Sequence, residues 1–155
     1  MGKMKLLLFV MLAAFLTAST GFAAETSFTT VMGPGYEVTR HKTPASGTAT
    51  FKLSKDGKEL SYQLRVKKIL NANATNIHRG KIGINGPPLV ELFTGARKGT
   101  FSGMLAEGVI TDKDLLGDLQ GKTLADLVQV MRSGEAYVNV YTDAFADGEI
   151  RGQIQ

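Results

Sequence analysis

The stretch Gly47–Val66, GTATFKLSKDGKELSYQLRV, is the part of the chain that decides the fold. Apolar residues recur at every second position in residues 49–53 and again in residues 60–66. Because successive side chains of a strand point to opposite faces, this period of two predicts two strands, each with one buried and one solvated face. Asp56-Gly57 between them favours a turn. The sequence therefore predicts a β-hairpin within an antiparallel sheet.

Further strands are expected on both sides of this hairpin. The candidates share short alternating or apolar patterns bounded by Gly, Pro or Asp, and they cover residues 28–32, 89–93, 99–105, 136–141 and 150–154. Residues 71–78 are interpreted as a loop leading into a short strand. Residues 80–88 are interpreted as a loop, because three Gly or Pro positions close it.

One region has a helical period instead. Between Thr123 and Gly134, apolar residues follow the i, i+3, i+4, i+7 spacing, which predicts an amphipathic helix over residues 123–133. Thr111, followed by acidic residues, indicates another helix start. We therefore expect an all-β fold, an antiparallel sandwich or barrel, with one or two short helices inserted near residues 111–133.

The first residues have the three parts of a secretory signal peptide. Two lysines precede an apolar run over residues 6–16, and small residues follow it. Small side chains are needed at positions −3 and −1, so we expect cleavage after Ala23; cleavage after Ala24 would place Phe22 at −3. The alternative, a retained anchor, is disfavoured because the run has 11 residues, whereas a bilayer requires roughly 20.

Composition narrows the functional classes. There is no Cys, which excludes disulfides, lipid attachment at a signal cysteine and thiol catalysis. The net charge is +4, and basic residues occur as scattered pairs such as Lys67-Lys68 and Arg97-Lys98. Nucleic-acid-binding surfaces need clustered Lys and Arg, so we expect no nucleic acid partner. We expect a protein exported to the periplasm or secreted, with no stable membrane anchor.

Four short stretches occur together: ASGTATF at 45–51, NIHRG at 76–80 with NGP at 85–87, GEAYVNV at 134–140 and GEIRGQI at 148–154. In order and spacing they resemble the CHRD domain, the module first named from chordin and common in exported bacterial proteins. The resemblance implies an immunoglobulin-like β-barrel similar to copper/zinc superoxide dismutases, and it implies no particular activity. We divide the chain into a signal peptide (1–23), an N-terminal segment with a candidate first strand (24–44) and a CHRD-like β domain (45–155).

The departures from this family concern metal binding. Many CHRD sequences have His-Ile-His where this chain has Asn76-Ile77-His78, and His where it has Tyr141. Histidines two apart on a strand share a face, and a third nearby could complete a metal site. Of the three positions this chain keeps His78 alone, which is therefore the one candidate metal ligand. No cofactor is expected.

His78 also has a structural interpretation, in which its ring hydrogen-bonds backbone and fixes the loop 80–88. His41 is expected to be exposed. Asp143, Asp147 and Glu149 crowd one turn, but their spacing matches no EF-hand, so a solvated turn is favoured over a calcium site.

Two further features also have a structural interpretation rather than a catalytic one. Glu149 and Arg151 share a strand face and are expected to form an exposed pair, contributing about 0–1 kcal/mol. A Ser/His/Asp hydrolase would have to use His78, and no serine lies in a Gly-x-Ser-x-Gly turn.

The leading functional hypothesis is a non-catalytic binding or structural module. Rigid β-sandwiches carry function on their loops, so residues 79–88 form the candidate binding loop, with His78, Arg79 and Asn85 as its candidate residues. The partner is expected to be an extracellular or periplasmic protein or polymer. The alternative is a weak or vestigial metal-binding protein of the superoxide dismutase type.

Overall fold

The computed structural model describes residues 26–155, so the predicted signal peptide and its cleavage positions at Ala23 and Ala24 lie outside the described residues. Ten elements follow one another along the chain. They are β1 (Ser27–Met32), η1 (Pro34–Tyr36), β2 (Ser46–Leu53), β3 (Leu60–Arg79), β4 (Pro88–Ile110), η2 (Asp112–Asp114), η3 (Gly117–Leu119), α1 (Leu124–Arg132), β5 (Ala136–Thr142) and β6 (Ile150–Gln153), where η denotes a 3-10 helix.

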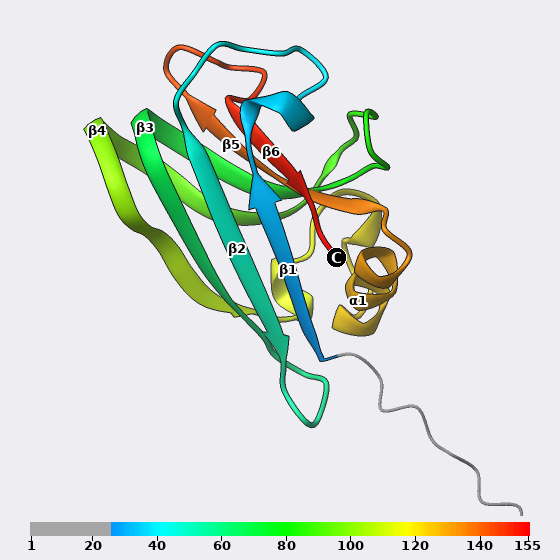
Figure 1. Cartoon of the computed structure of the whole chain (residues 1–155). Coiled ribbons are helices and arrows are strands. Elements are labelled where there is room, and N and C mark those ends of the chain that lie inside the picture. The colour runs from blue at the N-terminus through cyan, green and yellow to red at the C-terminus, as the bar shows by residue number, and fades with distance from the viewer. Residues whose placement is uncertain (1–25) are drawn as a thin grey trace, which may run out of the picture.

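The strands form one antiparallel six-stranded sheet in the order β1-β2-β3-β5-β6, with β4 paired to β3. The two end strands also meet, because Thr29 and Gln155 exchange backbone hydrogen bonds of 2.7 and 2.9 Å. Gly33 and Arg151 form a second, isolated bridge between the same two ends. The sheet therefore curls into a nearly closed barrel (Figure 1), which confirms the all-β antiparallel prediction. The expected β-hairpin is the β2–β3 pair, in which Ala49 faces Leu64.

The long strands β3 and β4 correct one part of the sequence interpretation. Over residues 71–78 the predicted short strand is present, but the loop predicted before it is wrong, because β3 runs through the whole range. Strand β3 pairs with β2 in its first half and with β5 in its second. The strand changes partners at a bend where Lys68 and Asn71 have φ values of 53° and 52°. The two strands expected at 89–93 and 99–105 are parts of β4. Bulges break the alternation without ending the strands.

The helical insert lies where the sequence predicts it. Thr123 and Asp126 form a capping box at the start of α1, with Thr123 N–H donating to Asp126 Oδ2 at 2.9 Å. Thr111 and Asp114 form the same arrangement at η2. The apolar residues of α1, Leu124, Leu127, Val128, Val130 and Met131, are buried. Within residues 26–155, no helix combines the length and apolarity required to cross a membrane.

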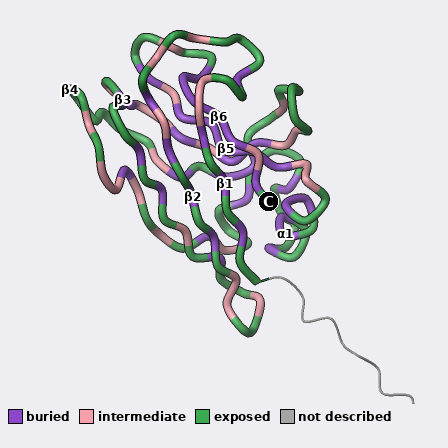
Figure 2. Tube along the Cα trace, in the orientation of Figure 1, coloured by how far each residue is buried: buried purple, intermediate pink, exposed green. Residues whose placement is uncertain are grey.

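The hydrophobic core fills the barrel, with contributions from every strand and from α1. Figure 2 shows that buried backbone concentrates along β5 and β6, whereas β2 alternates between buried and exposed positions. Six of the seven residues of β5 are buried, on both of its faces. One face of β5 is covered by the barrel core, so the other must be covered by different parts of the chain. That second face is the candidate functional site.

Candidate functional site

A layer of polar side chains lies on the face of β3, β5 and β6 that points away from the barrel core. In β5, Val138 and Val140 point into the core, so Tyr137, Asn139 and Tyr141 point the other way. Residues of the two neighbouring strands, β3 and β6, lie beside them on the same face. His78 of β3 pairs with Tyr137, and Arg151 of β6 pairs with Asn139. We call His78, Tyr137, Asn139, Tyr141, Arg151 and Gln153 the polar layer.

Two connecting segments contact the polar layer and bury most of it, leaving Tyr141 and Gln153 half-buried. The loop of residues 80–87 contacts it through backbone hydrogen bonds to His78, Tyr137, Arg151 and Gln153. The segment of residues 33–45 brings in Glu37, which is 6% exposed. From the alternating pattern of β5 and β6 alone, this face would be expected to contact solvent. In the structure, however, Arg151 is only 1% exposed.

His78 is held at both ring nitrogens. Nδ1 lies 2.9 Å from the carbonyl oxygen of Gly86, and Nε2 lies 2.8 Å from the hydroxyl of Tyr141. Because a carbonyl can only accept, Nδ1 donates to Gly86. In the neutral ring, Nε2 then accepts from the Tyr141 O–H. Burial, opposed by the Gly86 hydrogen bond and aided by the Arg151 charge, holds the pKa of His78 below its ordinary value. A metal ion at either nitrogen would have to displace one of these bonds.

Arg151 of β6 attaches the loop 80–87 to the barrel. Its Nη1 donates to Asn85 Oδ1 at 2.9 Å, and its Nη2 donates to the carbonyls of Lys81 and Ile84 at 3.0 and 2.9 Å. The guanidinium lies 3.4 Å from the centroid of the Tyr137 ring, an attractive cation–π arrangement. The expected exposed pair between Glu149 and Arg151 is wrong, because both residues are buried and Arg151 binds the loop instead.

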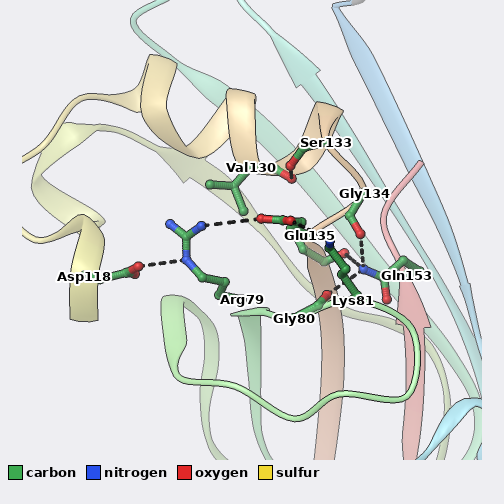
Figure 3. A network of polar contacts seen from close by, with 10 residues as sticks. Arg79, Gly80, Lys81, Asp118, Val130, Ser133, Gly134, Glu135 and Gln153 are labelled. Atoms are coloured by element: carbon green, nitrogen blue, oxygen red, sulfur yellow. Dashed lines mark hydrogen bonds and ion pairs between the residues drawn. The ribbon is translucent and has the colours of Figure 1, made fainter.

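Arg79 and Gln153 connect the loop to the helical insert (Figure 3). Arg79 Nε lies 2.8 Å from Asp118 Oδ2 of η3, and a second nitrogen lies 4.0 Å from Glu135. Gln153 Nε2 donates to the carbonyls of Gly80, Gly134 and Ala136 at 2.8 to 2.9 Å. The predicted binding-loop residues His78, Arg79 and Asn85 therefore all lie at this loop, and each holds it in place.

Glu37 is the most unusual ionisable group at the site. Burial raises its pKa to about 7; the nearby Arg151 lowers it and the Asp147 carboxylate raises it further. Its Oε1 is buried without a hydrogen-bond partner in residues 26–155. Burial, together with Tyr137 and Glu37, raises the pKa of Tyr141 to about 12. Glu37, with a pKa of about 7, is protonated below neutral pH, and a protonated carboxyl costs less to bury than a charged one.

The acidic turn after β5 is not one cluster. Asp143 pairs with Lys98, whereas Glu149 is buried and accepts from the hydroxyls of Thr43 and Thr142. Asp147 lies 3.3 Å from Nε2 of His41, whose side chain is 14% exposed and packs against Phe145. The predicted exposure of His41 is thus wrong, because Phe145 covers it. Within residues 26–155 no group of three His, Cys, Asp or Glu side chains could hold a metal ion.

Some of the solvent-facing residues around the site are large and apolar. A groove of about 310 Å³ runs between β1 and β6, and Val31, Tyr36 and Ile82 are among its lining residues. We call these three the apolar rim; their exposed fractions are 66, 58 and 75%. Ile84 of the same loop is 59% exposed. Sequence reasoning missed this rim, although two branched apolar residues within a Gly-rich loop were a usable signal.

One comparison with known proteins identifies a family for this chain. The family model described as the CHRD domain matches residues 28–154. This chain belongs to the CHRD domain family. The match includes β1, which lies in the segment 24–44 and pairs with β2 in the same sheet. Searches of curated proteins and of solved structures found no match.

Proposed function

We propose that this CHRD-domain protein is an exported, non-catalytic binding module whose partner contacts the apolar rim and the loop 80–87. One observation carries the proposal. Hydrogen bonds from buried Arg151 fix the backbone of the loop, while the side chains of Ile82 and Ile84 in the same loop are exposed to solvent. Exposed apolar side chains next to a groove are typical of interaction sites. A loop that is already ordered loses little entropy on binding.

The non-catalytic part of the proposal rests on how the reactive side chains are used. Both ring nitrogens of His78 are hydrogen-bonded. Arg151 donates to loop carbonyls and to Asn85, and Gln153 donates to the carbonyls of Gly80, Gly134 and Ala136. A catalytic base needs to reach a proton of the substrate. These residues instead support a structural role in presenting the loop.

Site-specific photo-crosslinking in the exporting cells tests the binding surface. A photoreactive residue at position 82 is compared with one at position 109, because Val109 is also exposed, at 51%, but lies on β4. We expect a discrete cross-linked product from position 82 and none from position 109. Equal products at both positions, or none at 82, would contradict the proposal.

Two further measurements separate this function from its alternatives. Copper or zinc titration of the purified protein should give no stoichiometric binding; tight binding that is lost in His78→Ala would favour the metal-binding alternative instead. Mass spectrometry of the exported protein should find its N-terminus after Ala23 or Ala24. An intact leader would contradict export by signal cleavage.

A further inference from the structure

The bend of β3 and β4 brings together basic residues that are scattered in the sequence. Lys67 and Lys68 lie between the ladder pairs Val66↔Gly103 and Ile69↔Phe101, and the next pairs along the ladder reach Ala72↔Arg97. The two lysines and the pair Arg97-Lys98 therefore lie on neighbouring strands at the same bend. All four are exposed.

Two more cations extend this surface. Arg65 of β3 lines a hollow of about 510 Å³ together with Lys67, and Lys42 lines a second hollow of about 450 Å³ together with Lys68. We call Lys42, Arg65, Lys67, Lys68, Arg97 and Lys98 the basic ridge. In Figure 1 the bend stands out as a corner of the barrel at the end of the molecule opposite the β2–β3 turn.

Few carboxylates neutralise the basic ridge. Asp143 lies 2.9 Å from Lys98. Glu149 lines the second hollow, but its carboxylate is buried and accepts from Thr43 and Thr142. Arg97 is held over the Phe101 ring at 3.9 Å. A surface with this excess of cations attracts anions over distances of about a Debye length.

The lining of the hollows indicates the kind of anion. Hydroxyl groups accompany the cations, from Ser46, Thr48 and Ser102 in the first hollow and from Thr100 in the second. A sugar unit offers hydroxyls and, where it is acidic, a carboxylate or sulfate, so it can satisfy both kinds of group. The flat plane of lipid headgroups would meet the ridge but would not enter the hollows.

We propose that the basic ridge binds an acidic polysaccharide, with single sugar units in the two hollows. The ridge shares no residue with the apolar rim, although Val31 of the rim also lines the first hollow. The inference goes beyond the binding function proposed above. It can fail independently of cross-linking at position 82, because Ile82 lines neither hollow. A chain bearing a charge on each unit would contact several cations at once, which increases avidity.

The test measures binding of the purified protein to immobilised polygalacturonate and dextran sulfate, with neutral dextran and phosphatidylglycerol vesicles as comparisons. We expect binding to at least one acidic polysaccharide that weakens as NaCl is raised, and none to neutral dextran. No binding to either polysaccharide, or tighter binding to the vesicles, would overturn the proposal.

A pair of matched variants locates the site. Lys67→Gln with Lys68→Asn removes two charges from the ridge, and Asn suits the left-handed φ of 53° at position 68. Lys55→Gln with Lys58→Gln removes two charges from the exposed turn at the other end. We expect a loss of about fivefold or more in the first and less than about twofold in the second.

Equal losses in the two double variants would mean bulk attraction only and would overturn the assignment to the ridge. Thermal unfolding checks that each variant is folded. If the first variant does not fold, Lys67→Glu alone replaces it, because position 67 is exposed and has no left-handed φ. It should weaken binding more than Lys55→Glu, and an equal effect would again overturn the assignment.

Discussion

At the scale of single residues, the site is defined by ionisable groups that the fold keeps out of water. His78 is hydrogen-bonded to Gly86 and Tyr141. Glu37 is buried within electrostatic range of Arg151, Asp147 and Tyr141. Their pKa values move in opposite directions from the ordinary ones, because burial always disfavours the charged form. Each shift makes stability depend on pH.

Glu37→Gln should remove one part of that dependence. Folded protein keeps the Glu37 proton up to about pH 7, whereas the unfolded chain releases it near 4.5. The folded state therefore binds more protons in this window, and stability falls as pH rises from about 5 to 7, by at most about 3 kcal/mol. Urea unfolding at pH 5, 6, 7 and 8 should show this fall in the wild type and a smaller one in the variant.

His78 contributes with the opposite sign, since its lowered pKa makes stability fall as pH drops through about 6.5. It is present in both proteins, so the difference between wild type and Glu37→Gln isolates Glu37. Glu107→Gln, at an exposed position of β4, is the control. A difference that stays constant from pH 5 to 8 would show that Glu37 titrates normally.

At the scale of elements, the polar layer acts as the support of the loop 80–87. Two backbone hydrogen bonds, both 3.0 Å long, lie within the loop region. Arg79 N–H donates to the Pro87 carbonyl and closes the two ends of the loop, and Ile84 N–H donates to the Lys81 carbonyl at its tip. A further backbone hydrogen bond, from Gly80 N–H to the Glu135 carbonyl at 2.8 Å, joins the start of the loop to the residue before β5. Side chains of β3, β5 and β6 supply other hydrogen bonds to the loop. The loop and the strand β6 are therefore coupled although they lie far apart in the sequence.

Arg151→Met should release the loop. The variant leaves the carbonyls of Lys81 and Ile84 without their donor, so the loop opens more often. In hydrogen–deuterium exchange we expect the amides of residues 80–87 to exchange about tenfold faster or more, with α1 unchanged. Arg65→Met, at an exposed position of β3, should leave the loop as it is. Equal acceleration in α1 would mean global destabilisation and no local anchoring.

At the scale of the whole molecule, β1 and β6 close the barrel by a close backbone approach. A side chain at Gly152 would collide with Thr30 Oγ1 and with the Val31 carbonyl. Glycine is therefore required where the two end strands come together. The closure also sets the groove beside the apolar rim, since β1 and β6 form its walls.

Gly152→Ala should force these strands apart. We expect it to lower the free energy of unfolding by about 1–3 kcal/mol, the usual effect of overpacking. Gly35→Ala is the matched control, because nothing lies within 4 Å of an added methyl group there; it should change stability by less than about 0.5 kcal/mol. Equal unfolding midpoints for the two variants in urea would show that the strands tolerate the methyl group.

The local patterns of the sequence predict much of the fold. The alternation at 47–66 and the caps at Thr111 and Thr123 lead to the β2–β3 hairpin, η2 and α1, because these signals act between residues close in the chain. The bulged strands β3 and β4 are different, since a broken alternation looks the same for a bulge and for a loop. Partner strands decide between the two.

The candidate site divides in the same way. Alternation in the sequence puts Tyr137, Asn139 and Tyr141 on one face of β5 and places His78 beside a loop. The folded chain adds that most of this face is buried and that Arg151 holds the loop. It also brings two basic pairs, far apart in the sequence, to neighbouring strands at one bend. The reason is physical: alternation specifies which residues share a face, whereas burial and clustering depend on distant segments that the folded chain brings to that face.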